Sequence, residues 1–350
     1  MTKKKKILVI LTGGTIGCAE ENGVRRVVPA TGARPHDILL LRDFLSRHPA
    51  YLPGEFEVFE PLRTLSENMT VKRLQTLIEY LKTVDFNAYR GIILTHGTDT
   101  LAYTAAFIAL VTKGIKIPIV LVSANAPLND AQSNGHKNFA AAVQFINLRR
   151  YFGTFVCYSY DDASVRFYTG EQVWQMDAVT ERFGSFPGGQ DGDDFGELRL
   201  LSREFIPFNS ALCGQKETAR FCPSEPLLYR LCDLEGGVLV IHPYPGLDYA
   251  QYNLDGVTTV LHTTYHSGTY CSDGEERSSL SLGWFKNRCA EKKIRLVVYA
   301  PHPSSIYESH IEGLPQITRV SLETAYVRIL TANSLDLETD AWEKLVLTGC

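Results

Sequence analysis

Two short segments combine glycine with threonine in a way that could place a hydroxyl group beside a ligand. The segment Thr12-Gly13-Gly14-Thr15 follows an apolar run at residues 7–11, and Gly97-Thr98-Asp99 follows a second run at residues 91–95. Glycines let the backbone approach a ligand closely and leave N–H groups that can hold a developing oxyanion. A threonine hydroxyl placed there becomes a nucleophile once a base removes its proton. Thr15 is therefore a candidate nucleophile, and the alternative is that it only completes a turn.

The neighbouring polar side chains are candidates for binding and proton transfer. Thr98 and Asp99 precede a helical pattern that begins at Leu101, so we expect one of them to cap that helix. The other stays available: the Asp99 carboxylate could bind a substrate ammonium, and Thr98 could orient water or relay a proton. Ser66, which comes after a further apolar run, could cap the helix that follows it, clamp a carboxylate, or do both. His96 is expected to be structural.

Apolar runs alternate with helical periodicity in the first half of the chain. The expected strands lie at residues 7–11, 56–60, 91–95, 117–122 and 154–160. Helices are expected at residues 71–81 and 101–110. Strands that are apolar on both faces are typical of a parallel sheet covered by helices. Ligands bind such sheets beyond the carboxyl ends of the strands, and all the polar segments follow expected strands, so we predict one shared site.

The predicted fold class is α/β, with two domains. Residues 1–195 would form a larger N-terminal parallel-sheet domain of the flavodoxin-like or doubly wound type, which carries the candidate threonines. Glycine, proline and acidic residues gather at about residues 184–230, and we expect residues 196–230 to be an interdomain linker that holds a short hairpin or two. Residues 231–350 would form a smaller C-terminal α/β domain. Its expected strands lie at residues 238–241, 257–262 and 294–299, and its helices at 280–292, 320–332 and 341–347.

Bulk composition disfavours several classes of protein. The 350 residues carry 35 basic and 39 acidic side chains, a net charge of −4, without a basic stripe, so we expect no nucleic-acid partner. The glycine segment lacks the spacing of phosphate-binding and dinucleotide-binding loops. No apolar run approaches the roughly 20 residues of a membrane-spanning helix. The run at residues 7–11, behind four lysines, is shorter than the roughly 7–15 apolar residues of a secretory signal. We therefore expect a cytoplasmic protein without membrane association.

The 8 cysteines are scattered, without a C-x-x-C pair or a nearby pair of histidines. A disulfide framework and a zinc site are both disfavoured, and the reduced thiols of a cytosolic protein fit this distribution better. We therefore predict no metal site.

Three segments, taken together, resemble those of a known enzyme family. Thr12-Gly13-Gly14-Thr15-Ile16 and His96-Gly97-Thr98-Asp99-Thr100 are similar to the two signature motifs of the bacterial-type L-asparaginases and glutaminase-asparaginases. Leu65-Ser66-Glu67-Asn68-Met69-Thr70 resembles the family's substrate-clamp segment, and it is especially similar to the asparaginase-like subunit of the archaeal glutamyl-tRNA amidotransferase. The resemblance is strong for about residues 6–145 and weak after residue 150.

The resemblance implies a two-domain hydrolase that releases ammonia from the carboxamide of asparagine or glutamine through a threonine ester, without a metal or an organic cofactor. Thr15 would attack the carboxamide carbon. The amides of Gly14 and Thr98, or their neighbours, would hold the oxyanion, and Thr98 would position the water. The implied catalytic residues are thus Thr15, Thr98 and Asp99.

The resemblance also implies how a small amino-acid amide would bind. Ser66, Glu67 and Asp99 would hold its α-carboxylate and α-amino groups. The implied substrate-binding residues are Gly14, Ser66, Glu67, Gly97 and Asp99. Sites in this family are completed by a neighbouring subunit, so a homodimer or a homotetramer is implied as well.

Two positions depart from the family pattern. The loop after the first strand carries an activating tyrosine in the family, whereas residues 17–33 of this chain contain none and place Arg26 and Val27 there. The family's lysine beside the Thr-Asp pair is also missing, because residues 153–189 contain no lysine and Arg166 stands near its place. Arginine keeps its proton at neutral pH and cannot act as a base. Lys137 or Tyr168 could compensate.

These departures leave three functions open. The first is an amidohydrolase that acts on L-asparagine or a related small carboxamide. The second is a binding or sensor protein that keeps the amino-acid clamp but has lost the base. The third, an amidotransferase component that acts with a tRNA-handling partner, is disfavoured by the acidic charge balance.

Overall fold

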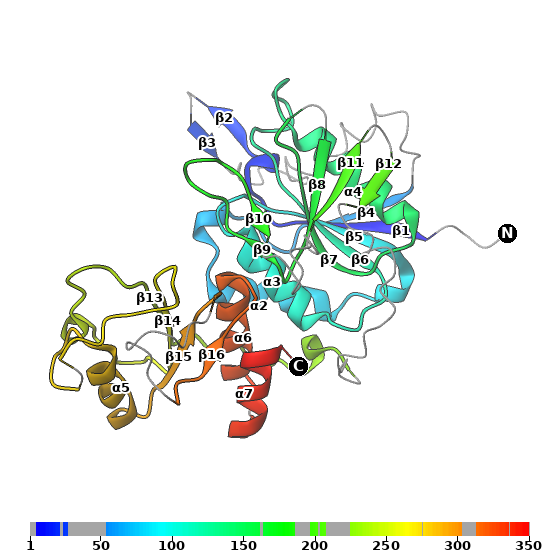
Figure 1. The fold of residues 1–350 in the computed structure, drawn as a ribbon. Helices are drawn as coiled ribbons and strands as arrows, with labels where there is room; N and C mark the ends of the chain where they lie inside the picture. Colours follow the sequence, from blue (N-terminus) through cyan, green and yellow to red (C-terminus); the bar gives the residue numbers. More distant parts are fainter. Residues whose placement is uncertain are drawn as a thin grey trace. The chain divides into compact units, whose positions relative to one another are not determined.

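The chain forms two compact units in the computed structural model, Met1–Arg230 and Leu231–Cys350 (Figure 1). The structure describes residues 5–21, 24–26, 54–161, 164–185, 197–201, 204–207, 225–274, 276–302, 313–335 and 337–349. Both units combine a sheet with helices, so the predicted α/β class is confirmed. Within the described ranges, no helix is long and apolar enough to cross a membrane.

The first unit is built on an eight-stranded sheet in the order β12-β11-β8-β7-β6-β5-β1-β4. Its strands are β1 (Lys6–Leu11), β4 (Phe56–Phe59), β5 (Tyr89–Thr95), β6 (Pro118–Val122), β7 (Gly153–Tyr158), β8 (Ser164–Thr169), β11 (Glu197–Leu201) and β12 (Glu204–Pro207). The run from β4 to β7 is parallel throughout. Counted along the chain, these parallel strands follow the 2-1-3-4-5 order of flavodoxin-like folds, as the sequence predicts.

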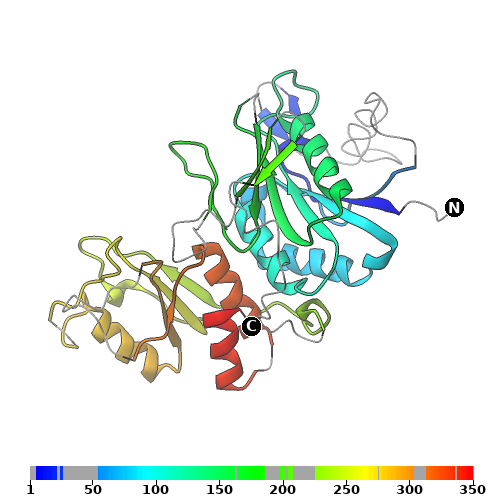
Figure 2. The same cartoon turned by 45° about the vertical axis from the view of Figure 1, so that its right-hand side comes forward.

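Helices cover both faces of this sheet. They are α2 (Val71–Lys82), α3 (Leu101–Val111) and α4 (Gly135–Leu148), and Figure 2 shows α4 across the sheet from the other two. The aromatic side chains of Phe139 and Phe145 on α4 pack against Val9, Ile93 and Val120 of the central strands. Because residues alternate between the faces of a strand, the intervening apolar residues face α2 and α3. Burial on both faces explains why these strands read as continuous apolar runs.

The described part of the predicted linker, residues 197–201, 204–207 and 225–230, belongs to the first unit. Strand β11 pairs antiparallel with β8 and with β12, so the hairpin extends the large sheet of the first unit. The short 3-10 helix Leu227–Tyr229 packs against α2 and α3. The expected hairpin is thus present, but it is part of the sheet of the first unit. The cluster of glycine and proline marks turns locally, but it does not report which distant strand the intervening residues join.

A second hairpin lies just after β1, where no strand was predicted. Thr15–Gly17 forms a 3-10 turn, and β2 (Ala19–Glu21) then pairs antiparallel with β3 (Val24–Arg26). Arg26, the residue at the place of the family's tyrosine, thus belongs to β3. Val27 and the rest of that loop, residues 27–33, lie outside the described residues.

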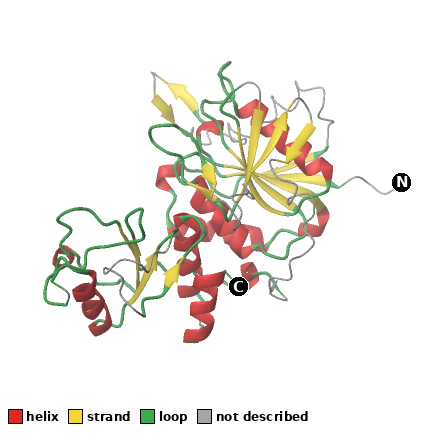
Figure 3. Cartoon of the chain, viewed as in Figure 1, coloured by secondary structure: helices red, strands yellow, loops and turns green. Residues whose placement is uncertain are grey.

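The second unit contains a four-stranded parallel sheet in the order β13-β14-β15-β16. Its strands are β13 (Val238–Ile241), β14 (Thr259–Thr263), β15 (Arg295–Tyr299) and β16 (Gln316–Ile317). Its helices, shown in Figure 3, are α5 (Leu282–Glu291), α6 (Leu322–Asn333) and α7 (Thr339–Thr348). Phe285 of α5 packs into a core with Val260 and Leu296.

Candidate active site

The candidate site lies where the order of the parallel strands reverses. The chain leaves β1 for β4 on one side of it and later reaches β5 on its other side. A reversal of this kind leaves a crevice beyond the carboxyl ends of the two central strands. The segment Thr12-Gly13-Gly14-Thr15 follows β1 at this point, and His96-Gly97-Thr98-Asp99 follows β5. The topology thus brings the two glycine segments together.

Gly14 and Gly97 are the point of contact between these segments. Gly14 has a φ of 81°, and a Cβ atom built on it would lie 2.3 Å from the Gly97 nitrogen and 2.5 Å from the His96 carbonyl carbon. Only glycine can occupy a position with this backbone conformation and this close an approach. The next residue on each segment is a threonine, so Thr15 and Thr98 flank the same contact.

Backbone hydrogen bonds tie the segment after β4 to the segment after β1. The Thr64 N–H donates to the Thr12 carbonyl at 3.0 Å, and the Gly14 N–H donates to the Thr64 carbonyl at 3.0 Å. This pairing continues the β1–β4 ladder beyond its last residues and delivers Ser66 to the crevice. It also uses the Gly14 N–H, which leaves the amides of neighbouring residues for the expected oxyanion contact. Within the described residues, the N–H groups of Thr15 and Thr98 have no acceptor.

Ser66 and Asp99 are joined by two hydrogen bonds across the crevice. The Ser66 hydroxyl donates to Asp99 Oδ2 at 3.0 Å, and the Asp99 N–H donates to Ser66 Oγ at 3.2 Å. Thr100 adds a third bond, from its hydroxyl to the Ser66 carbonyl at 2.8 Å. Ser66 is buried, whereas Asp99 is exposed. Ser66 therefore orients the carboxylate.

Neither helix is capped as the sequence suggested. Thr100, and not Thr98 or Asp99, occupies the N-cap position of α3, and it makes no side-chain capping bond. Thr70 caps α2 by accepting a hydrogen bond from the Arg73 N–H. The expected cap of α3 by Thr98 or Asp99 is therefore wrong, and Ser66 does not cap α2, since Thr100 and Thr70 occupy the N-cap positions. As a result, Thr98 and Asp99 keep their side chains for the crevice.

His96 is hydrogen-bonded within the segment His96-Gly97-Thr98-Asp99 and to α3. Its Nδ1 lies 2.7 Å from the Gly97 carbonyl, which can only accept, so Nδ1 carries the proton and Nε2 accepts from the Thr104 hydroxyl at 2.9 Å. Burial lowers the pKa of His96 to about 4, which keeps the ring neutral. This geometry agrees with the expected structural role. Thr104, a lone polar residue in an apolar helix, is a partner that sequence reasoning missed.

The hydroxyls of the first segment have different surroundings. Thr12 donates to the Thr95 carbonyl at 2.6 Å, so its hydroxyl is used to join the ends of β1 and β5. Thr15 and Thr98 are half-buried, and within the described part of the chain neither side chain makes a hydrogen bond. Glu67 is exposed beside Ser66. Thr15 is therefore the hydroxyl of this segment that is open to a ligand.

Lys137 and Tyr168, the two residues that could replace the missing base, make contacts away from Thr15. Lys137 donates from Nζ to the Asp161 carbonyl at 2.5 Å, and the Tyr168 hydroxyl lies 3.3 Å from the Tyr160 hydroxyl in the interior. Arg166 stacks over the ring of Tyr160. Among the described residues, no histidine, cysteine and carboxylate cluster could hold a metal ion.

Comparisons with known proteins show which family the chain is similar to. Residues 6–187 match the family model described as "Asparaginase, N-terminal". The chain is 31% identical over 143 residues to "L-asparaginase 1" of Escherichia coli (strain K12), which is 40% of each chain. It is 33% identical over 140 residues to a component of the glutamyl-tRNA(Gln) amidotransferase of Methanococcus vannielii, which is 40% of this chain and 31% of the relative.

The matched segment thus spans at most about 40% of the length of these curated relatives. A solved structure, the thermostable L-asparaginase from Thermococcus kodakarensis, superposes with a TM-score of 0.73 at 20% identity and covers 97% of this chain and 96% of its own. At this level of identity, the likeness shows a shared fold.

Proposed function

This chain belongs to the asparaginase family, and on that premise we propose that it is an amidohydrolase that releases ammonia from L-asparagine or a related small carboxamide. The observation that carries the proposal is the contact between Gly14 and Gly97, which supports a pocket shared by Thr15 and Thr98. The hydrogen-bonded pair of Ser66 and Asp99 adjoins this pocket, because Asp99 directly follows Thr98 in the chain.

In the proposed reaction, Thr15 Oγ attacks the carboxamide carbon. The carbonyl oxygen becomes an oxyanion that the N–H groups of Thr15 and Thr98 can hold, in place of the occupied Gly14 N–H. As this intermediate collapses, the proton lost by the Thr15 hydroxyl is transferred to the leaving nitrogen, so that ammonia departs and an ester remains on Thr15. Water that Thr98 orients then hydrolyses the ester, which releases the acid product and restores the hydroxyl.

The proposed substrate contact of Asp99 is an ammonium group. Its carboxylate is exposed and held in place by the Ser66 hydroxyl and by no cation among the described residues. An α-ammonium that approaches from solvent would gain a charge-assisted hydrogen bond. Ser66 then acts as a positioning residue. Glu67, exposed beside it, would add negative charge that favours the same cationic group.

A second candidate function is binding of an amino acid without turnover. It is favoured by the bonds that occupy Lys137 and Tyr168 away from Thr15. General-base help is worth about 10²–10⁴-fold in rate, so a threonine without it reacts slowly near neutral pH. A homodimer or homotetramer in which a second copy of the chain supplies the base would restore the hydrolase, and we propose this assembly in the cytoplasm for the first function.

Ammonia release separates these functions. Wild-type protein should release ammonia from asparagine, and Thr15→Ala should abolish the release. The matched control is Thr83→Ala, which removes a hydroxyl that bonds to the Tyr80 carbonyl at the end of α2. Equal rates for wild type and Thr15→Ala would rule out Thr15 as the nucleophile. A panel with glutamine and other amides defines the substrate.

Calorimetric titration with aspartate and asparagine completes the test. Stoichiometric binding without ammonia release would support the binding protein and contradict the hydrolase. Copurification with a second, tRNA-handling protein would instead support the amidotransferase role that the name of the Methanococcus relative carries.

A further inference from the structure

The backbone on both sides of Thr98 is anchored by side chains. Before Thr98, His96 Nδ1 donates to the Gly97 carbonyl at 2.7 Å. After Thr98, the Asp99 N–H donates to Ser66 Oγ at 3.2 Å. Each of these bonds holds one of the two peptide groups that flank Thr98. Because a peptide group is planar, neither group can rotate without breaking its bond.

Cys18 holds the backbone around Thr15 in the same way. Its Sγ donates to the Gly14 carbonyl at 3.2 Å, and its backbone N–H donates to the Thr15 carbonyl at 3.1 Å. These carbonyls belong to the peptide groups before and after Thr15. A thiol is a weak donor, but Cys18 is 0% exposed, so water does not compete for this bond. Both candidate threonines therefore have a fixed backbone.

The anchored carbonyls determine where the N–H groups of Thr15 and Thr98 point. In a trans peptide the N–H points opposite to the C=O, and both peptide groups are trans. The carbonyls of Gly14 and Gly97 point toward buried side chains, so the N–H groups of the same two peptides point away from those side chains. The contact between Gly14 and Gly97 places the two peptide groups next to each other.

The same bonds make the two N–H groups stronger donors. A carbonyl that accepts a hydrogen bond polarises its own peptide group, and hydrogen bonds in a chain strengthen one another. The effect is larger at the His96 end, because a ring N–H is a stronger donor than a thiol. Burial lowers the pKa of His96 to about 4, so the ring is neutral near pH 7 and its single proton stays on Nδ1.

We propose that Cys18 and His96 are positioning residues for the oxyanion of the hydrolysis. By holding two backbone carbonyls, they direct the N–H groups of Thr15 and Thr98 toward the same oxygen atom. Neither side chain has to touch the substrate for this. The role rests on the proposed function, whereas the anchoring of the two peptide groups is a property of the chain itself.

Matched pairs of variants test each bond through kinetics. Cys18→Ser keeps a donor of similar size and Cys18→Ala removes it, whereas His96→Asn keeps a nitrogen donor near Nδ1 and His96→Leu removes it. Loss of an oxyanion donor costs about 10²–10³ in kcat, and misalignment costs part of this. We therefore expect kcat to fall about tenfold or more in His96→Leu and about fivefold in Cys18→Ala, with KM within about twofold. The two variants that keep a donor should stay within about threefold of wild type.

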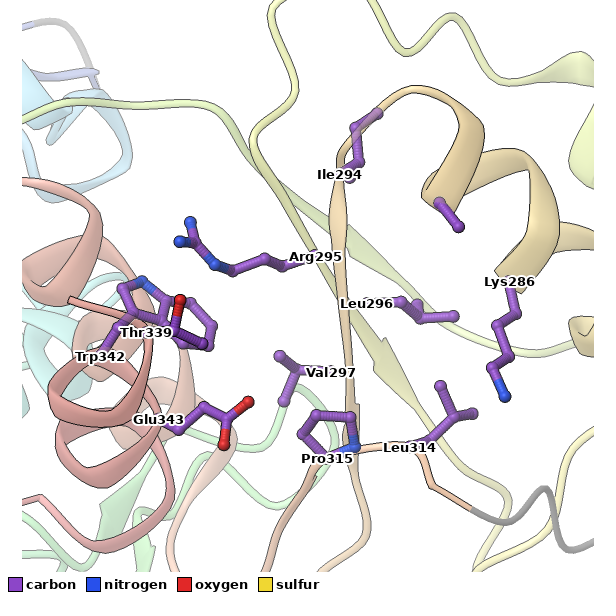
Figure 4. Close-up of a pocket in the computed structure, with 11 residues that line it drawn as sticks. Lys286, Ile294, Arg295, Leu296, Val297, Leu314, Pro315, Thr339, Trp342 and Glu343 are labelled. Carbon is purple, nitrogen blue, oxygen red and sulfur yellow. The ribbon is translucent and has the colours of Figure 1, made fainter. Parts of the chain in front are cut away.

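Two controls separate this role from ordinary stability. Cys157 is also 0% exposed and donates from Sγ to the Asn138 carbonyl at 3.3 Å. Cys157→Ala removes the same atoms and the same kind of bond as Cys18→Ala, but it should leave kcat unchanged. Ala290→Leu changes the packing of a cavity of about 280 Å³ that residues of α5, β15 and α7 line in the second unit (Figure 4), and it should leave kcat unchanged as well. An equal loss of kcat in Cys157→Ala would overturn the role of Cys18.

Nitrogen chemical shifts from NMR spectra of the whole labelled chain report the anchoring without a reaction. The shift of the Thr98 nitrogen should change more in His96→Leu than in His96→Asn, and that of the Thr15 nitrogen more in Cys18→Ala than in Cys18→Ser. Equal changes within each pair would overturn the anchoring, whatever the activity. The expected shifts together with unchanged kcat would overturn the positioning role. A wild type that releases no ammonia would overturn the proposed function and the role within it, while the shifts would still decide the anchoring.

Discussion

Gly14 and Gly97 approach so closely that a single Cβ atom on Gly14 would fall 2.3 Å from the Gly97 nitrogen. The contact joins the ends of two strands that are neighbours in the sheet but lie more than 80 residues apart in the chain. Because it is made by backbone alone, the distance between the two segments cannot relax by a rotamer change. The two glycines thus hold the segments after β1 and β5 at this separation.

Gly14→Ala should therefore unfold the site and destabilise the protein. The backbone conformation of Gly14, with φ of 81° and ψ of 176°, costs a residue with a Cβ about 1–3 kcal/mol, and the forced separation of the segments adds about 1–3 kcal/mol. Gly54→Ala is a matched control, since Gly54 has a φ of 85° and no atom within 4 Å of the added Cβ. In urea unfolding, Gly54→Ala should lower the free energy of unfolding only by the cost of the backbone conformation. Similar losses at both positions would contradict the close contact.

Loss of the hydrogen bond between Ser66 and Asp99 should weaken substrate binding. Ser66→Ala frees the carboxylate to rotate, so we expect KM to rise about tenfold with a smaller change in kcat, as loss of a hydrogen bond to a charged group of about 1.5 kcal/mol predicts. Thr70→Ala is the control, because it removes the cap of α2 and should cost about 1 kcal/mol of stability without changing KM. A fall in kcat alone would place Ser66 in the chemical step instead.

Buried His96 should make stability depend on pH. Its pKa is about 4 in the folded chain and about 6.5 in an unfolded one, so between these values the unfolded state binds the extra proton. The contribution of His96 to the free energy of unfolding is therefore complete above about pH 6.5 and decreases as the pH falls toward 4. At pH 5 it has decreased by about 2 kcal/mol.

His96→Asn should flatten this dependence in urea unfolding measured at pH 7.5 and pH 5. His262, whose pKa burial also lowers to about 4, makes the corresponding contribution in the second unit, and His262→Asn is the parallel variant. An unchanged difference between the two pH values in His96→Asn would show that this ring is charged in the folded protein.

Local patterns in the sequence were enough to predict many of the strands and helices, but not α4, β8 or the β2–β3 hairpin. The expected helix at residues 71–81 is α2, Val71–Lys82, and the expected strand at residues 238–241 is β13. Both depend on apolar periodicity within a few turns of chain. The convergence of the polar segments was also predictable, because parallel strands place their carboxyl ends on one edge.

Pairings between distant residues were not predictable in this way. The Ser66 hydroxyl finds its partner 33 residues later, and the Gly14 N–H is used by Thr64 across the sheet edge. The pairing of the β11–β12 hairpin with β8 also joins residues that are distant in the sequence. Each of these depends on which strands become neighbours, and no residue near them in sequence carries that information.

The identity of the base is the last point that variants can decide. Lys137 bonds to the Asp161 carbonyl and Tyr168 lies beside the Tyr160 hydroxyl, so neither bond leads to Thr15. Lys137→Met and Tyr168→Phe should therefore change the rate of ammonia release by much less than the roughly 10²-fold that loss of a general base costs. Each variant is measured beside wild type at saturating asparagine, with thermal unfolding to verify its fold. A loss of 10²-fold or more in a folded variant would identify that residue as the base and would require it to turn toward Thr15 when substrate binds.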